Sequence, residues 1–391
     1  PAAGTGGFLT EAESYMRRVE PGVVPSLFGQ ELNAESYAIC KADMLIKGHK
    51  VEQIKLGNSF TYDYLGNRTF DFMLTNPPFG VDWSKSEKAI RDEHERKGFQ
   101  GRFGPGLPRK TDGSLLFLMH LMAKMDDPRD GGSRIGIILN GSPLFTGSAG
   151  SGESEIRRYL LEHDLLEAIV GLPTELFYNT GIATYVWVLN NAKPKHRKGQ
   201  VQLIDASERY ARMRKSLGNK RAYMPESEQD DVVRLYGRMD ETSESKLFPN
   251  EAFGYRRITV EQPLRLNFQA SEERIARIPD QKTIAKLNPA QQQAVQDACR
   301  RLDGALYRDR EAFLPGLKQA LGRTGIKFTA SQIKAVWWAL AERDESAEIC
   351  RDSKARAEPD PDLRDTENVP LGEDVWDYFE REVKPHVPDA W

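Results

Sequence analysis

Four consecutive residues, Asn76, Pro77, Pro78 and Phe79, place an amide, two prolines and an aromatic ring directly after the strand-like stretch 68–75. Proline has a carbonyl but no N–H, and a residue before proline is held extended, so this segment is stiff and rich in acceptors. The Asn76 side-chain oxygen and the Pro77 carbonyl can accept two hydrogen bonds from one amino group, and Phe79 adds an aromatic face. We expect a ligand with an amino group on a flat ring; a rigid turn that closes a strand is the structural alternative.

The neutral amide of Asn76 cannot act as a general base, so the segment does not remove a proton first. Two acceptors around an amino group instead favour tetrahedral geometry at the nitrogen and free a lone pair that is otherwise delocalised into the ring. That lone pair needs a strong electrophile held close to it, and the methyl group of a sulfonium qualifies. The sequence therefore predicts S-adenosylmethionine as the methyl donor.

A glycine-rich turn at the start of the chain offers a place for that donor. Gly4, Gly6 and Gly7 precede an expected helix, and such a turn lets a cofactor approach the backbone at a helix N-terminus. Glu31 ends the next expected strand, where an acid can accept hydrogen bonds from ribose hydroxyls. A tight strand-to-helix connection is the alternative for the glycines alone. The chain begins at Pro1, so the strand that should precede this turn is expected to be missing from the sheet.

Strand-like and helix-like stretches alternate up to residue 206, which predicts a Rossmann-like α/β fold with a mostly parallel sheet. Asn33 is expected to cap a helix to about Lys47, with Tyr37, Cys40, Met44 and Leu45 on its buried side. Residues 114–125 read as a buried helix, and 184–191 and 199–206 as an antiparallel edge hairpin. The stretch 80–113 is expected to be a long polar loop, functional or disordered. We expect a catalytic domain at 1–206, an irregular connection at 207–270, with a short strand pair within 255–268, and a helical assembly region at 271–391.

Composition and charge are those of a globular protein without membrane spans. The chain has 391 residues and a net charge of −3, and it contains no apolar run long enough to cross a membrane. The three cysteines are far apart, so neither a disulfide framework nor a metal site is expected, and a reducing cytoplasm fits. The run 209–221 contains Lys and Arg but no acid, which fits either a solvated surface or a phosphate-contacting stripe.

The order of a glycine-rich turn, an acid and Asn-Pro-Pro-Phe resembles the amino-methyltransferases that act on adenine N6. More specifically, the chain resembles the methylation subunit of type I restriction–modification systems. The resemblance is carried by "GTGGFL", "TNPPFG", "TDGSLLFLMHLM", "GSPLF", "SGESEIRRYLLEHDLLEAIVGLPTELFYNTGIATYVWVLNN" and the tail "ENVPLGEDVWDYFEREVKPHVPDAW".

The resemblance implies roles for particular residues. Asn76, Pro77, Pro78 and Phe79 would hold an adenine flipped out of duplex DNA. S-adenosylmethionine would lie against Gly4, Thr5, Gly6, Gly7, Glu31, Asn58 and Asn76. We expect contacts with double-stranded DNA from Arg102, Lys110, Arg212, Arg214, Lys215, Lys220 and Arg221.

The resemblance also implies partners: a specificity subunit that reads the DNA sequence, a restriction subunit and a second methylation subunit, with no role for a membrane. Trp376, Tyr378 and Phe379 are expected either to bind a partner or to pack locally. Two other functions remain open. One is an amino-methyltransferase for adenine in RNA or for a protein glutamine. The other is a truncated, non-catalytic fragment that acts only in subunit assembly.

Overall fold

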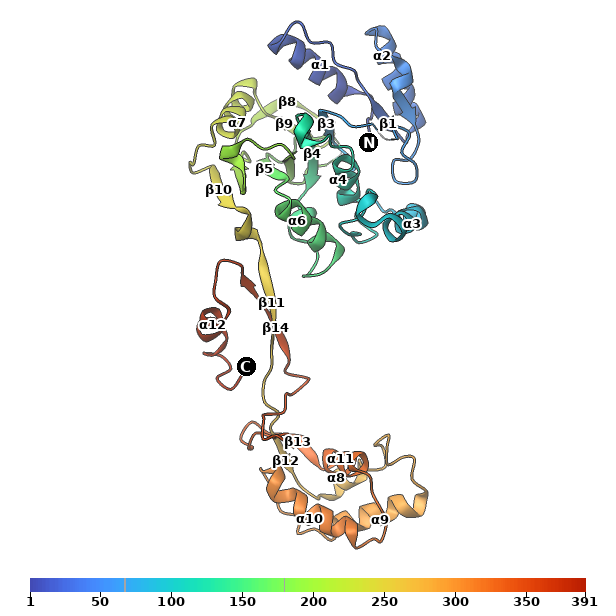
Figure 1. The fold of residues 1–391 in the computed structure, drawn as a ribbon, viewed down its shortest axis with the longest axis vertical. Helices are drawn as coiled ribbons and strands as arrows, with labels where there is room; N and C mark the ends of the chain where they lie inside the picture. The colour runs from blue at the N-terminus through green and yellow to red at the C-terminus, as the bar shows by residue number, and fades with distance from the viewer. Residues whose placement is uncertain (67, 179) are drawn as a thin grey trace. The chain divides into compact units, whose positions relative to one another are not determined.

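A six-stranded mixed sheet lies at the centre of the first of two units, Pro1–Gly254 and Tyr255–Trp391 (Figure 1). The computed structural model describes residues 1–66, 68–178 and 180–391. The strand order is β10-β7-β5-β6-β4-β3, in which β3 runs parallel to β4 and β5 runs parallel to β7. The strands are β3 (Phe72–Thr75), β4 (Arg134–Asn140), β5 (Leu166–Leu172), β6 (Thr184–Asn190), β7 (Gln200–Asp205) and β10 (Ser245–Pro249).

The expected α/β fold is confirmed, but the sheet is not mostly parallel as expected, because three of its five described strand pairings are antiparallel. The expected hairpin of β6 and β7 is also wrong. Strand β6 lies between β4 and β5 and is antiparallel to both, whereas β7 lies on the other side of β5. The antiparallel edge is supplied by β10, which pairs with β7. Trp187 explains the central place of β6, because its side chain is buried in the largest apolar core of the unit.

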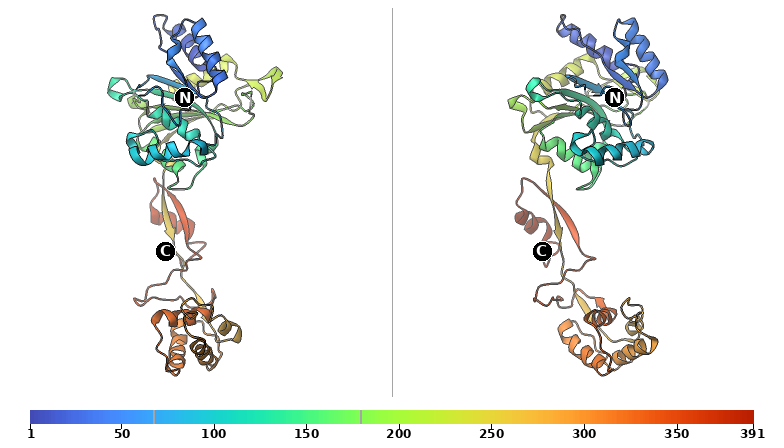
Figure 2. Two further views of the ribbon diagram at one scale, coloured as in Figure 1. Left: turned by 90° about the vertical axis from the view of Figure 1, so that its right-hand side faces the viewer. Right: turned by 45° about the vertical axis from the view of Figure 1, so that its right-hand side comes forward.

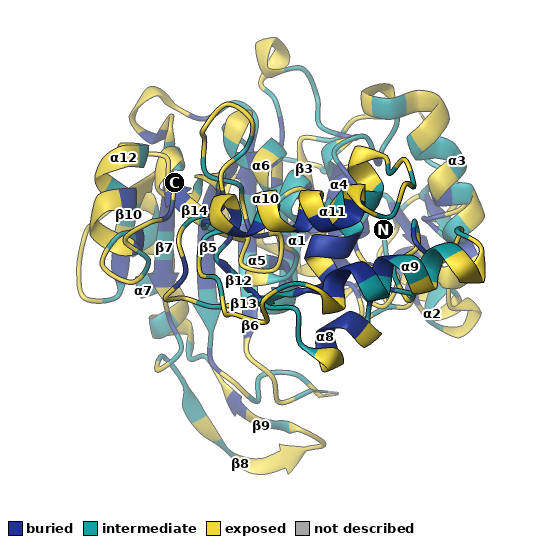
Figure 3. Cartoon of the chain, turned by 90° about the horizontal axis from the view of Figure 1, so that it is seen from below, coloured by how far each residue is buried: buried dark blue, intermediate teal, exposed yellow. Residues whose placement is uncertain are grey.

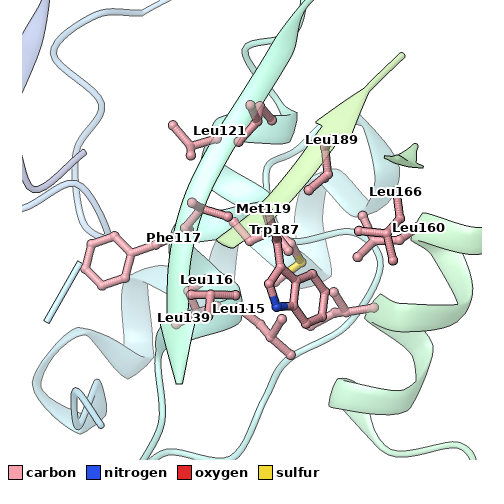
Figure 4. Packing of buried hydrophobic residues seen from close by; sticks show 14 of the residues in the cluster. Leu115, Leu116, Phe117, Met119, Leu121, Leu139, Leu160, Leu166, Trp187 and Leu189 are labelled. Atoms are coloured by element: carbon pink, nitrogen blue, oxygen red, sulfur yellow. The ribbon is translucent and has the colours of Figure 1, made fainter. Parts of the chain in front are cut away.

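Helices cover this sheet: α3 (Glu87–Lys97), α4 (Ser114–Met122), α5 (Ser142–Phe145), α6 (Gly152–Glu162) and α7 (Glu226–Arg238). Helix α4 is buried along almost its whole length, as its continuous apolar sequence predicted. Figure 4 shows its leucines packed around Trp187 and Leu139 of the sheet and Leu160 of α6.

The stretch 80–113 is not one long loop, because α3 lies within it. This helix is polar, and Ile90 is its buried residue. On its surface, Arg91 pairs with Glu87 and Arg96 pairs with Asp92, each across one turn of the helix. The apolar periodicity that identifies a helix from sequence is therefore almost absent, and tertiary contacts through Ile90 make the helix stable here.

A smaller layer contains the start of the chain: α1 (Gly7–Val19), β1 (Gly29–Glu31), α2 (Ala34–Ile46) and β2 (Ile54–Leu56). Strands β1 and β2 are parallel, and α1 and α2 lie side by side in every view (Figures 1 and 2). Asn33 caps α2 by accepting a hydrogen bond from the Ser36 N–H, as predicted. Cys40 and Met44 are buried, but Leu45 is 67% exposed, so its predicted place in the core is wrong.

Residues 1–3 connect this layer to the large sheet. The Ala3 N–H donates to the carbonyl of Gln30 in β1, at 3.0 Å. The Thr75 hydroxyl at the end of β3 donates to the carbonyl of Pro1, at 2.6 Å. Among residues 1–66, 68–178 and 180–391, β1 and β2 pair with each other and not with β3, which is an edge strand of the large sheet beside β4.

The second unit contains an antiparallel ribbon of β11 (Tyr255–Val260) and β14 (Asp365–Pro370), with α12 (Val375–Tyr378) and a π-helical turn, Phe379–Val383, packed on it. A helical group lies between the two strands in sequence. It comprises β12 (Leu266–Phe268), α8 (Glu272–Ala276), α9 (Pro289–Arg300), α10 (Arg310–Gly322), α11 (Ala330–Ala339) and β13 (Ala341–Arg343). The expected strand pair within 255–268 is wrong, because β11 pairs with β14 and β12 pairs with β13.

The division into two units falls between Gly254 and Tyr255, whereas the sequence predicted boundaries at 206 and 270. Residues 207–254 belong to the first unit because β10 extends its sheet. In the described part of the chain, no helix is both long and apolar enough to span a bilayer. All three cysteines are buried free thiols, and burial raises the pKa of Cys299 to about 12.

Candidate functional site

The Asn-Pro-Pro-Phe segment begins where β3 ends. Strand β3 is parallel to β4, so the segment lies at the edge of the sheet formed by carboxyl ends of strands, where α/β folds commonly bind ligands. Pro77 is buried, whereas Pro78 is exposed. The Asn76 side-chain oxygen is buried and has no hydrogen-bond partner among the described residues.

An unpartnered buried acceptor is unusual, because leaving one unsatisfied costs about 1–3 kcal/mol. The prolines that follow Asn76 have no N–H to offer, so the segment itself cannot satisfy this oxygen. The position is therefore prepared to receive a hydrogen-bond donor from elsewhere.

Two more unpartnered oxygens occur at this edge of the sheet. They belong to Asn140, the last residue of β4, and Thr184, the first residue of β6, and the two residues are register partners. Sequence reasoning did not identify either one. The only signal was that each is a polar residue at one end of a strand whose middle is apolar.

An aromatic pair flanks the same segment. The rings of Phe79 and Phe177 meet edge to face, with centroids 6.5 Å apart and an interplanar angle of 81°. Sequence reasoning identified Phe79 but missed Phe177, which lies in the irregular segment after β5. A planar ligand on Phe79 would thus have a second aromatic side chain close to it.

The glycine-rich turn has the backbone geometry that its sequence predicts. Gly4 and Gly6 have positive φ angles of 59° and 87°, which favour glycine. A Cβ on Gly6 would lie 2.9 Å from the Cys40 sulfur, so this glycine allows α1 to pack against α2. At Gly4 and Gly7 a Cβ would meet nothing within 4 Å, so the space beside these residues is open. Thr5 is exposed at the tip of the turn.

Glu31 is next to this turn, so residues 27 positions apart in sequence come together. One carboxylate oxygen of Glu31 accepts from the Gly4 N–H at 2.7 Å, and the other accepts from the Asn33 N–H at 2.8 Å. The carboxylate is buried and accepts these two bonds while retaining further lone pairs. An open glycine turn beside a buried acid fits a nucleoside cofactor, whose ribose hydroxyls are donors.

Asn58 follows β2, and both ends of its amide are engaged. Its oxygen accepts from the Phe60 N–H at 2.9 Å, and its nitrogen donates to the Ser86 hydroxyl at 3.1 Å. The side chain therefore closes the turn after β2 and connects it to the segment before α3. Its expected contact with an adenine ring stays a prediction.

Arg102, an expected DNA contact, has a different role. Its guanidinium forms an ion pair with Glu93 at 2.6 Å and donates to the backbone carbonyls of Ser59 and Phe60. It also lies 3.0 Å from Nδ1 of His120, and its side chain is only 11% exposed. Its hydrogen-bonding groups are used within the fold, so we correct the prediction and assign Arg102 a structural role.

His120 completes this buried cluster. Burial lowers its pKa well below the ordinary value of 6.5, and the nearby positive charges of Arg102 and Lys124 add to that effect. The ring is thus neutral, and Nδ1 can accept from Arg102.

The other expected DNA contacts lie at or near the surface. Lys110 is about half exposed and pairs with Glu87 at 2.7 Å. A ribbon of β8 (Ala211–Leu217) and β9 (Lys220–Tyr223) carries the remaining five. Figure 3 shows this ribbon, largely exposed, at the margin of the first unit.

Within the ribbon, the cations differ in their partners. Arg212 and Arg221 both pair with Glu175, and Lys220 lies over the Tyr178 ring at 5.1 Å from its centroid. Arg214 and Lys215 form no ion pair with any residue that the structure describes. These two are therefore the cations of the ribbon most available to an anionic ligand.

Comparison with known proteins places these features in context. A model of the N-6 DNA methylase family matches residues 1–252. The chain is 26% identical over 262 residues to the type I restriction enzyme MjaIX methylase subunit of Methanocaldococcus jannaschii, covering 66% of this chain and 44% of that protein. It is 31% identical over 211 residues to the HindI methylase subunit of Haemophilus influenzae, covering 53% and 43% respectively.

A solved structure is similar as well. The methyltransferase subunit of a type I restriction–modification system from Streptococcus thermophilus superposes with a TM-score of 0.53 at 25% identity. The match covers 64% of this chain and 49% of that one. The chain thus spans less than half the length of each of these relatives. The stretch that matches the family model, residues 1–252, includes both the glycine-rich turn and the Asn-Pro-Pro-Phe segment.

Proposed function

The chain belongs to the N-6 DNA methylase family, and from this premise we propose that it is the catalytic part of a DNA adenine-N6 methyltransferase. The observation that carries the proposal is the buried, unpartnered oxygen of Asn76 at the end of β3. The exocyclic amino group of adenine is the donor that this oxygen lacks. S-adenosylmethionine, the proposed cofactor, would supply the electrophilic methyl group.

Residues 1–4 form hydrogen bonds with both β1 and β3. These bonds support the proposal that the cofactor site and the site of the target amino group lie close together. Gly4 contacts Glu31, the last residue of β1, and Pro1 contacts Thr75, which directly precedes Asn76. A cofactor on the glycine turn and an amino group on Asn76 are thereby held by neighbouring segments. This is catalysis by positioning, which reduces the entropic barrier of bringing two reactants together.

Each residue of the segment has a proposed part in the reaction. Asn76 and the Pro77 carbonyl accept hydrogen bonds from the amino group and orient its lone pair. Phe79, with Phe177 at its edge, stacks on the flipped base and offsets part of the few kcal/mol that flipping costs. Lys110 and the β8–β9 ribbon contact DNA phosphates, with Arg214 and Lys215 as the main cations.

We further propose that the chain works with other subunits of a type I restriction–modification system, as the names of its relatives indicate for those proteins. These are a specificity subunit, a restriction subunit and a second methylation subunit, acting on DNA in the cytoplasm. Trp376 in α12 is 67% exposed and supports partner binding there, whereas Phe379 is buried and packs locally.

Calorimetric titration with S-adenosylmethionine tests the cofactor site. We expect binding by the chain, weaker binding by Glu31→Ala, and unchanged binding by Asn76→Ala. Glu35→Ala is the matched control, because Glu35 is an exposed acid in the first turn of α2. Absence of binding by the unaltered chain would overturn the assignment of the cofactor site.

Methyl transfer to three acceptors then tests the substrate. We expect transfer to adenine in duplex DNA and not to adenine in RNA or to a glutamine peptide. Transfer to either of the latter two in preference to DNA would contradict the proposal. No transfer to any acceptor, from a chain that binds the cofactor, would leave assembly as its function.

A further inference from the structure

The helical group of the second unit forms a separate module, residues 264–360. Both of its ends lie together, because the Leu264 N–H donates to the Glu358 carbonyl at 2.8 Å and Pro263 bridges to Pro359. The module has its own apolar core, which includes Phe268, Leu317 and Trp337. It lies outside the stretch that matches the methylase family, so catalysis does not account for it.

Charge is distributed unevenly over this module. Residues 312–341 contain no Asp or Glu, yet they include Lys318, Arg323, Lys327 and Lys334. All four cations are exposed, and none forms an ion pair with any residue in the described ranges. Elsewhere in the module, arginines such as Arg274 and Arg343 are paired with acids. Within 312–341 these four cations therefore have no acid beside them in the sequence, and they lie on α10, α11 and the loop between the two helices.

Helix α11 gives this charge a defined surface. Ser331, Lys334 and Trp338 are three and four residues apart, so they share one face of the helix, and all three are exposed. Trp338 is 41% exposed, whereas its neighbour Trp337 is buried against Phe268.

The start of α11 adds to the positive charge of this face. Arg323 and Lys327 lie in the loop just before the helix, whose N-terminus carries a partial positive charge of its own. We define the α11 surface as Arg323, Lys327, Ser331, Lys334 and Trp338.

We propose that the α11 surface binds the phosphate backbone of duplex DNA, as a contact additional to those of the first unit. Cations without nearby acids, an exposed hydroxyl and a helix N-terminus are the groups that proteins use for phosphates. The exposed Trp338 ring supplies apolar contact with sugar or base edges. The choice of DNA as the polyanion rests on the proposed function, and the surface would add affinity without reading sequence.

Fluorescence anisotropy of the full chain with a labelled duplex of about 30 bp tests this inference, over salt concentrations from about 50 to 200 mM. The test variant is Arg323→Gln/Lys327→Gln/Lys334→Gln. Its matched control is Lys282→Gln/Lys286→Gln/Arg301→Gln, which removes three exposed, unpaired cations from another part of the same module. Each phosphate contact adds about 0.9 to the slope of log affinity against log salt.

We expect the test variant to lose affinity at least about tenfold and to reduce that slope by about 2–3, while the control changes neither by a comparable amount. Trp338→Ala should weaken binding by about threefold to tenfold, more than Trp376→Ala does. Equal behaviour of the two triple variants would overturn the proposal. So would a test variant that binds DNA normally but loses binding to poly-glutamate, since that result indicates an acidic protein partner.

The test also separates this inference from the proposed function. Binding of S-adenosylmethionine should be the same for both triple variants, because the cofactor residues lie in the first unit. A chain that binds duplex DNA through the α11 surface but transfers no methyl group would support the inference and contradict the catalytic proposal.

Discussion

The Asn76 segment and the Arg102 cluster are two polar regions of the same unit, and both were expected from sequence to contact a ligand. At Asn76 a buried oxygen has no partner, whereas at Arg102 the guanidinium has an acid, two carbonyls and a histidine around it. A residue whose bonding groups are already satisfied holds the fold together. At Asn76 the unsatisfied acceptor also lies at the edge of the sheet where α/β folds commonly bind ligands, so it can receive a donor from a ligand.

The contrast between Arg102 and Asn76 predicts that the largest effect is a loss of stability in an Arg102 variant. Arg102→Ala leaves the largely buried carboxylate of Glu93, 14% exposed, with only the backbone N–H of residue 102 as a donor, so we expect the free energy of unfolding of the first unit to fall by about 3 kcal/mol. Denaturant titration measures this. The control is Arg96→Ala, whose pair with Asp92 is exposed and contributes about 1 kcal/mol or less. If the Arg102→Ala protein is stable but has lost DNA binding, the structural role is wrong and Arg102 is a DNA contact.

Asn76→Ala is expected to show the opposite pattern. Methyl transfer to DNA should fall by about 100- to 1,000-fold, the effect of removing one positioned hydrogen-bonding group, while the free energy of unfolding stays the same or rises slightly. Asn191→Ala is the matched control, because its amide is bonded to Ser133 and Asp126. That variant should lose stability and keep methyl transfer. Strong destabilisation by Asn76→Ala would remove the contrast between the two regions.

Phe79→Ala is expected to have a smaller effect on the same site. Loss of a stacking surface should weaken binding of DNA with an extruded base by about 1–3 kcal/mol. Fluorescence of 2-aminopurine at the target position reports how much of the base is extruded. The signal should be lower for Phe79→Ala, and Phe79→Tyr should keep the signal of the unaltered chain. Phe248→Ala, an exposed aromatic of β10 away from the segment, is the control. If Phe79→Ala and Phe248→Ala behave alike, the aromatic pair takes no part in base binding.

The smallest expected effect is a dependence of stability on pH in the Arg102 cluster. The pKa of His120 is lowered by burial, so the unfolded chain takes up a proton near pH 6.5 that the folded chain does not. The contribution of this group to stability is therefore present above about pH 6.5 and is lost as pH falls below that value. Unfolding titrations at several pH values should show a shallower decline for His120→Gln than for the unaltered chain. Identical declines would exclude this contribution.

Sequence predicted local features of the fold because local chemistry dictates them. The Asn33 cap, the buried helix α4 and the glycine-rich turn before α1 each depend on a few adjacent residues, and the structure has all three. The pairing of β6 could not be predicted in this way. A short connection to β7 favoured a hairpin, but burial of Trp187 between β4 and β5 decides the position of β6.

Site residues could likewise be predicted only where adjacent residues give the signal. The Asn-Pro-Pro-Phe segment has a distinctive order of side chains, so its place at the end of β3 could be predicted. Phe177 has no such local signal, since only the fold brings it to Phe79. Arg102 was misread because its partner Glu93 belongs to α3, a helix that the polar sequence of 80–113 concealed.

The insertion of the helical module between β11 and β14 has a mechanical consequence. The ribbon is closed by pairs from Tyr255 with Pro370 to Val260 with Asp365, and the module begins and ends on the far side of those pairs. A peptide bond cut inside the module, for example between α9 and α10, would therefore not release α12 from the rest of the protein. The backbone hydrogen bonds between β11 and β14 would hold the two fragments together, and the fragments would separate only when the ribbon is denatured.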